Sequence, residues 1–331
     1  MTLRVDRPGD LLAVRFATSP VWETAHAVRA LVRPVTPHQE PWLRTVTEAA
    51  RALDLGPLRA VNPPRGYTPD FLTPPPTSPS PRFADQLAAV RRTPPEQVRD
   101  ELGRCLAELG ERADPADRTA IERLLAEPAA GLVTLADGLD EAWRALVEPY
   151  WPRVSELLRA DIAYRSQSLA ERGLGHVLEH LDPSIRWTGS AIVIDRPGPL
   201  EEVPPDERGI VLMPSAYTWP SVAVVADHPW QPTIVYPARG IGRLWAAPDP
   251  APSALARLLG PTRAAVLIAL DAPASTTAVA ARFAMSPSGA SRHLLALRDA
   301  GLLVTTRHGH EVRYARTRLG TALVRASSPG G

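Results

Sequence analysis

Residues Ser286–Leu303 (SPSGASRHLLALRDAGLL) have the composition of a helix that binds a polyanion at its N-terminal end. Ser286 is a candidate N-cap, and Pro287 suits the first helical position. The next residues are small except for Arg292 and His293, and small side chains allow the backbone to approach a nucleic acid closely. Arginine makes paired hydrogen bonds to guanine, and a helix N-terminus attracts phosphate. The stretch therefore predicts a recognition helix that enters the major groove of DNA.

A second stretch, His176–His180 (HVLEH), has the spacing of a zinc-peptidase motif. Two histidines four residues apart share one face of a helix and can bind zinc, with Glu179 as the general base. Five-residue motifs also arise by chance. We therefore expect an exposed or core-edge histidine pair without a function. A zinc-dependent hydrolase is kept as the alternative function, and zinc sensing by the same pair is an intermediate possibility. The candidates for a third zinc ligand are Glu201, Glu202, Asp206 and Glu207.

The residues around the recognition helix predict the elements that position it. Helices are expected at SALARLLG (253–260), PTRAAVLIAL (261–270) and TTAVAARFA (276–284), where apolar residues recur three and four apart. A tight turn at Met285 leads into the recognition helix, and Gly301 ends it. The segments LLVTT, RHGHE and VRYAR then predict a two-stranded ribbon with a basic tip. The apolar stripe of the recognition helix consists of Ala290, Leu294, Leu295, Leu297 and Ala300.

We predict that this module contacts DNA through the starts of its last two helices and through the ribbon. His293 contacts either a phosphate or a group within the domain, because helix geometry alone does not decide which face it occupies. The ribbon is either a solvated hairpin or a DNA contact, and its basic residues beside a recognition helix favour DNA. The predicted DNA-binding residues are Thr276, Thr277, Ser286, Ser288, Gly289, Ser291, Arg292, His293, Arg307, His308, His310 and Arg313.

The charge distribution agrees with a polyanionic partner at the C-terminal end. From Ser253 onward there are ten arginines and three acidic residues, a net charge of +7, whereas the whole chain carries +1. A small basic module on a larger acidic body is expected where one end binds nucleic acid. Cys105 is the only cysteine, which excludes an internal disulfide and a thiolate metal cluster within one chain. We predict no cofactor, no metal site and no catalytic residue.

The first 250 residues predict a larger domain of helices and strands. Helical periodicity is expected over Trp22–Leu31, Trp42–Leu53 and 96–181. Between them, the prolines of Gly56–Pro95 predict loop or extended structure. The runs IRWTGSAIVID, GIVLMPSAY, SVAVVAD and PTIVYPA predict an antiparallel meander. Four aromatic residues near these strands either line a ligand pocket or belong to the core: Trp219, Trp230, Tyr236 and Trp245. The proline-rich segment, with Tyr67 and Phe71, either closes such a pocket or packs without a function.

These patterns together predict an α+β protein. A large mixed helical and antiparallel-β N-terminal domain, of one or two subdomains, is expected over 1–247, followed by a linker over 248–252 and a winged helix-turn-helix over 253–331. All eight tryptophans precede residue 250, so the C-terminal module has a core without them. No run approaches the roughly 18 apolar residues of a membrane span, and the N-terminus lacks a signal-peptide pattern. We expect a cytoplasmic protein without membrane contact.

The run Ser291–Leu302 (SRHLLALRDAGL) closely resembles the recognition-helix pattern of the ArsR/SmtB family of bacterial winged-helix transcriptional regulators. The preceding LGPTRAAVLIAL is similar to the core helix of that family. The resemblance implies a dimeric, operator-binding regulator, often a repressor. The chain departs from the metal-sensing members, because the helix TTAVAARFA lacks their Cys-x-Cys and the terminal TRLGTALVRA lacks their acidic and histidine ligands.

The N-terminal part resembles a domain of unknown function that precedes such winged helices, in PDFLTPPP, WPRVSELLRADIAYR and PWQPTIVYPARGIGRLW. That resemblance brings no ligand with it. We therefore predict a repressor that binds double-stranded DNA as a homodimer on an inverted repeat. The N-terminal domain would supply dimer contacts and bind a small-molecule effector or a partner.

Overall fold

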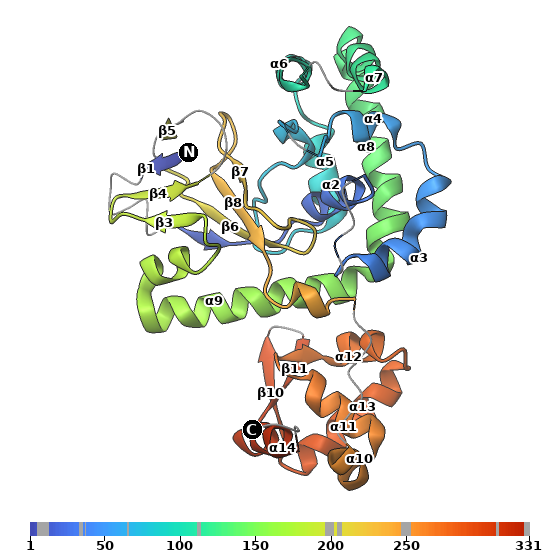
Figure 1. Ribbon diagram of the computed structural model, residues 1–331, viewed down its shortest axis with the longest axis vertical. Coiled ribbons are helices and arrows are strands. Elements are labelled where there is room, and N and C mark those ends of the chain that lie inside the picture. Colours follow the sequence, from blue (N-terminus) through green and yellow to red (C-terminus); the bar gives the residue numbers. More distant parts are fainter. Residues whose placement is uncertain are drawn as a thin grey trace. The chain divides into compact units, whose positions relative to one another are not determined.

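The computed structural model describes residues 1–4, 13–32, 36, 38–64, 66–110, 114–195, 202–203, 207–245, 253–308 and 311–327. The chain divides into an N-terminal unit, Met1–Tyr150 with Asp161–Ile241, and a C-terminal unit, Trp151–Ala160 with Gly242–Gly331 (Figure 1). The predicted linker over 248–252 lies outside the described residues. None of the described helices combines the length and apolar character that a bilayer crossing requires.

Helices and sheets make up the N-terminal unit, which confirms the predicted α+β class (Figure 1). Most of its helices carry proline in the first turn, where the missing amide donor costs nothing. Ser19 caps α2 by accepting a hydrogen bond from the Trp22 amide. The helices are α2 (Pro20–Ala30), α3 (Glu40–Arg51), α4 (Gly56–Ala60), α5 (Phe83–Val90), α6 (Pro95–Glu108), α7 (Pro115–Ala126), α8 (Pro128–Ala142), the short turns η1 (Asp70–Leu72), η2 (Trp143–Val147) and η3 (Glu148–Tyr150), and α9 (Trp151–Glu179), whose first ten residues belong to the C-terminal unit.

The prediction of loop or extended structure over Gly56–Pro95 is wrong in part, because α4 and α5 lie within it. Pro57 occupies the first turn of α4, a position that tolerates proline, and the interior of α5 contains none. Among its described residues, the proline-rich segment between these two helices has turns, bends and irregular structure apart from η1. It packs against the unit, since Phe71 and Leu72 are buried.

The described residues of the N-terminal unit form two four-stranded sheets, and their strand pairing corrects the predicted antiparallel meander in part: β3–β4, β4–β1 and β7–β8 pair antiparallel, whereas other neighbours pair parallel. β6 (Val211–Ser215) pairs parallel with both β2 (Arg15–Phe16) and β8 (Thr233–Pro237), and only β7 (Ala223–Val225) pairs antiparallel with β8. The chain leaves β6, crosses to the far edge to form β7, and returns through a hairpin, which aligns β8 with β6. The other sheet has the order β3 (Ile185–Trp187), β4 (Ala191–Ile194), β1 (Thr2–Arg4), β5 (Glu202–Val203), with β1 and β5 parallel.

Alternating residues of β6 and β8 bury both faces of their sheet. Leu212 and Ile234 pack into a cluster with strands of the other sheet and the end of α9. Their neighbours Met213 and Val235 pack against Trp22 of α2. A period of two places successive side chains on opposite faces, so the β6–β8 sheet is the middle layer between the β3–β4–β1 sheet and the helices.

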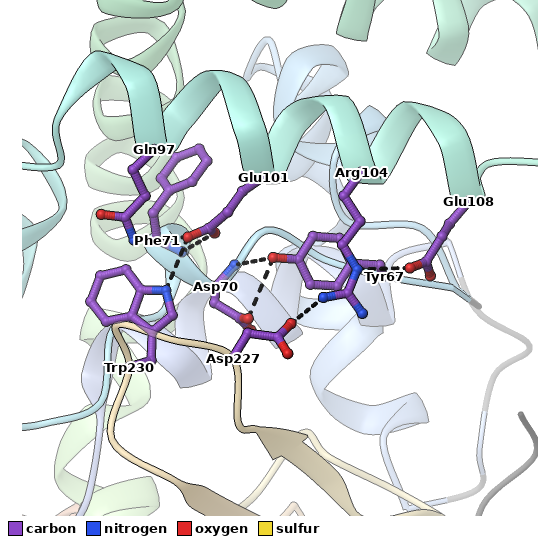
Figure 2. Close-up of polar contacts among 9 residues, drawn as sticks. All are labelled: Tyr67, Asp70, Phe71, Gln97, Glu101, Arg104, Glu108, Asp227 and Trp230. Carbon is purple, nitrogen blue, oxygen red and sulfur yellow. Dashed lines mark hydrogen bonds and ion pairs between the residues drawn. The ribbon is translucent and has the colours of Figure 1, made fainter. Parts of the chain in front are cut away.

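Tyr67 and Phe71 of the proline-rich segment are fastened to α6, as Figure 2 shows. The Arg104 guanidinium lies 4.1 Å from the centre of the Tyr67 ring. The Phe71 amide donates to Glu101 Oε2 over 2.8 Å, and Trp230 Nε1, from beyond β7, donates to Glu101 Oε1 over 3.0 Å. Glu101 of α6 therefore holds both the proline-rich segment and the β7–β8 connection.

The four aromatic residues predicted near the strands have different surroundings. Tyr236 is fully buried and donates a hydrogen bond to Asp161 over 2.9 Å, so it belongs to the core. Trp219 is 40% exposed, Trp230 hydrogen-bonds to α6, and Trp245 falls in the C-terminal unit.

The described residues of the C-terminal unit form a helical core with a three-stranded sheet. Its elements are α10 (Ser253–Leu259), α11 (Pro261–Ala269), β9 (Ala274–Ser275), α12 (Thr276–Arg282), α13 (Pro287–Asp299), β10 (Leu303–His308), β11 (Glu311–Arg316) and α14 (Arg318–Ser327). β9 adds a strand that the sequence did not predict, antiparallel to β11. The core gathers apolar residues from α11, α12, α13, β10 and β11.

Candidate DNA-binding site

Helices α12 and α13 form a helix-turn-helix whose two starts are capped by serine side chains. Ser275 Oγ accepts from the Ala278 amide over 3.2 Å, and Ser286 Oγ accepts from the Gly289 amide over 3.1 Å. The turn between the helices is closed by a hydrogen bond from the Met285 amide to a carbonyl of α12. These local bonds satisfy amides that a helix start leaves without partners, and they orient the start of α13.

One side of α13 packs against the core and the other is exposed, as the apolar stripe in the sequence predicts. Leu294 and Leu297 are buried, and Leu295 is half-buried. Ala300, predicted to belong to the apolar stripe, is exposed. Gly301 has a φ of 72° and donates to the Arg298 carbonyl, a conformation that glycine adopts readily and that ends the helix.

The starts of both helices present most of their predicted DNA-binding side chains to solvent. Ser288 and Arg292 are exposed, and Ser291 is half-buried on α13. Gly289 is buried, and its amide serves the N-cap. In the first turn of α12, Thr277 is exposed and Thr276 is half-buried. Small polar side chains together with one arginine are the chemistry that a major groove accepts.

His293 lies beside two arginines at this surface. Partial burial, followed by the positive charges of Arg263 and Arg292, lowers the pKa of His293. A neutral imidazole is therefore favoured in the absence of DNA. A phosphate placed beside it would oppose the effect of the arginines.

The ribbon β10–β11, which we call the wing, places its predicted residues in three situations. Arg307 is exposed on β10. The backbone of His308 lies opposite that of Glu311 in the register of the ribbon. His310 lies outside the described residues. Arg313 is buried, 9% exposed, and its guanidinium lies 3.3 Å from Glu311 and 3.7 Å from Glu156.

Glu156 of α9 is the neighbour of the wing that sequence reasoning missed. It lies far from Arg313 in the sequence, and a helical glutamate shows no pattern that would link it to a distant strand. Two further arginines of the module also serve its own packing: Arg282 donates to the Ala269 carbonyl, and Arg316 donates to the Leu270 carbonyl. Both bonds satisfy backbone oxygens near the end of α11.

The His176–His180 motif lies at the end of α9, after a break at Gly173, where φ is 81°. The two imidazole rings pack together with centroids 3.9 Å apart, and His180 Nδ1 contacts the His176 carbonyl over 2.8 Å. Within the described ranges no group of three or more histidine, cysteine or acidic side chains is placed to hold a metal ion. Of the candidate third ligands, Glu201 and Asp206 lie outside those ranges.

The hydrolase alternative makes a prediction about zinc content. A hydrolase of this kind requires one zinc ion per chain. We expect zinc well below one equivalent in protein purified without chelators and analysed by atomic emission. Stoichiometric zinc that disappears in a His176→Ala variant would contradict this expectation.

Comparisons with known proteins confirm the two resemblances seen in the sequence. Residues 258–306 match a family described as a helix-turn-helix domain, and residues 86–242 match a family of unknown function, DUF5937. The C-terminal unit thus carries an ArsR-type helix-turn-helix domain, preceded in the chain by the domain of unknown function.

The helix-turn-helix domain is homologous to the HTH-type transcriptional regulator CmtR of Mycobacterium bovis and of two strains of Mycobacterium tuberculosis. Each is 44% identical to this chain over 68 residues, which cover 19% of this chain. The match spans 58% of the length of each relative. No solved structure matches the chain significantly.

Proposed function

We propose that this protein is a sequence-specific DNA-binding transcriptional regulator that acts as a repressor in the cytoplasm. The observation that carries the proposal is the exposed start of α13, where Ser288 and Arg292 flank a capped helix N-terminus. Helices of this kind dock in the major groove through their first residues. The homology to CmtR and the net charge of +7 from Ser253 onward support the same function.

The regulator is proposed to act as a homodimer on an inverted repeat. Two recognition helices about one helical turn apart, roughly 34–36 Å, contact two half-sites. The N-terminal unit then binds an effector or a partner and changes the spacing or the mobility of the two winged helices. The protein exerts its effect through binding rather than through catalysis.

Fluorescence anisotropy with labelled DNA tests this function. The full chain is titrated against DNA from upstream of its own gene and against a scrambled duplex, each at two salt concentrations. We expect tighter binding to the native sequence, weakening as salt rises, because binding to phosphates releases counterions. Equal affinity for both duplexes, or no binding with or without candidate effectors, would contradict the proposal.

Replacing Arg292 with alanine is expected to weaken binding to the native sequence by about 1–3 kcal/mol and to relax specificity at one base pair. The reason is that an exposed arginine at the docking end of α13 can make two hydrogen bonds to guanine. Anisotropy against the native duplex and against single-base variants measures both effects.

The matched control is Arg298→Ala, which removes the same charge from the other end of α13. Arg298 is exposed and paired with Asp299 over 2.6 Å. We expect a small change from this variant, similar for every duplex. Equal losses from the two variants would show that Arg292 contributes only its charge.

A further inference from the structure

The first turns of α9 belong to the C-terminal unit and bring a carboxylate to the wing. Glu156 Oε2 lies 3.7 Å from Arg313 Nη2 on β11. The Glu156 side chain is 12% exposed and that of Arg313 is 11% exposed. One arginine of the predicted DNA-binding set therefore faces a buried carboxylate instead of solvent.

Two arginines and two glutamates alternate at this contact. Arg159 Nη1 lies 3.6 Å from Glu156 and 3.7 Å from Glu311. Arg313 Nε donates to Glu311 Oε2 over 3.3 Å. The four charges balance, so the basic character of Arg313 is neutralised where it meets α9.

The ion pair between Glu156 and Arg313 is weak, because its two atoms lie 3.7 Å apart, too far for a hydrogen bond. Both carboxylate oxygens of Glu156 are buried without a hydrogen bond, an arrangement that costs free energy for a charged group. Burial raises the pKa of Glu156, against the opposing effect of Arg313 and Arg159. A DNA phosphate could accept charge-assisted hydrogen bonds from the Arg313 guanidinium at a shorter distance than the 3.7 Å that separates it from Glu156.

We propose that Glu156 withholds Arg313 from the DNA backbone, so that the contact between α9 and the wing lowers DNA affinity until it is broken. This inference rests on the proposed function and adds its regulation. Helix α9 contributes its first ten residues to the C-terminal unit and the rest to the N-terminal unit. An effector or partner that displaces the start of α9 would release Arg313 and strengthen binding.

The experiment is a double-mutant cycle on DNA affinity in the full chain. Glu156→Gln keeps the shape of the side chain and removes its charge. We expect this variant to bind the native duplex at least about fivefold more tightly than the wild type, within the usual range of coupling between sites. The slope of log affinity against log salt should steepen by about one, as for one additional phosphate contact.

The combination with Arg313→Gln identifies the group that Glu156 controls. In the Arg313→Gln background, Glu156→Gln is expected to leave affinity nearly unchanged, since the wing guanidinium is gone and Arg159, the other arginine beside Glu156, keeps Glu311 as a partner. Asp299→Asn is the matched control: it removes one negative charge from the same unit, next to Arg298. We expect less than about a twofold change from that variant, because exposed charges are screened by salt.

Three results would overturn the inference. A gain that persists in the Arg313→Gln background, or an equal gain from Asp299→Asn, would mean that only overall charge matters. A lower affinity of Glu156→Gln would mean that the ion pair merely supports the wing, which faster hydrogen exchange of the β10–β11 amides would show independently. If the wild type and every variant fail to discriminate native from scrambled DNA, the proposed function itself fails.

Discussion

Leu294→Ala is expected to lower the free energy of unfolding of the C-terminal unit by about 2–5 kcal/mol, the usual range for a fully buried leucine. Leu294 is 0% exposed and packs with Val266, Val279 and Tyr314, from α11, α12 and β11. The cavity left by alanine would lie where three elements meet the recognition helix. Affinity for the native duplex should fall together with stability, because the start of α13 is no longer held in place.

Urea unfolding of the full chain, with hydrogen exchange resolved by peptide, measures this effect and assigns it to the C-terminal unit. The control is Leu295→Ala on the same helix. Leu295 is half-buried, so its removal is expected to cost roughly 1 kcal/mol. If both variants lose the same stability, Leu294 does not lie deeper in the core than Leu295.

Glu23→Gln is expected to stabilise the N-terminal unit increasingly as pH rises from about 4.5 to about 8. Glu23 is 1% exposed, and Glu23 Oε2 accepts a hydrogen bond from the Ala216 amide over 2.9 Å. Burial raises the pKa of Glu23 from 4.5 to about 8, although hydrogen bonds from Ser215, Ala216 and Tyr217 oppose it. In this pH window the folded protein holds a proton that the unfolded chain releases. Stability therefore falls as pH rises.

The size of this effect follows from the shift in pKa. One pKa unit corresponds to about 1.4 kcal/mol, so the whole window corresponds to roughly 5 kcal/mol. Glutamine cannot ionise and still accepts from the Ala216 amide. Urea unfolding at pH 5 and at pH 8.5 should show a gap between Glu23→Gln and wild type that widens by several kcal/mol.

Asp85→Asn is the control for this pH dependence. Asp85 is exposed and hydrogen-bonded to Arg82, which lowers the pKa of Asp85. Its carboxyl is ionised throughout the window, so the gap between this variant and wild type should stay constant. Asp70, whose pKa burial raises to about 8, contributes equally to wild type and to Glu23→Gln and cancels in their difference. A constant gap for Glu23→Gln would refute the ionisation of a buried Glu23.

The sequence by itself determined the local elements of the C-terminal unit. Ser286 and Pro287 start α13, and Gly301 ends it, because capping and backbone freedom depend on only a few neighbouring residues. The helical periodicity around them predicted which side of α13 packs, except that Ala300 is exposed. The homology to a helix-turn-helix domain confirms this part.

Tertiary structure alone decided the pairing of strands and the partners of buried charges. β6 and β8 pair parallel because the intervening β7 takes the outer edge, and strand periodicity is the same in either direction. Glu23 and Glu156 have the sequence appearance of solvated helical glutamates. Their burial against Ala216 and Arg313 depends on segments far away in the chain, and that burial raises the pKa of both carboxyl groups.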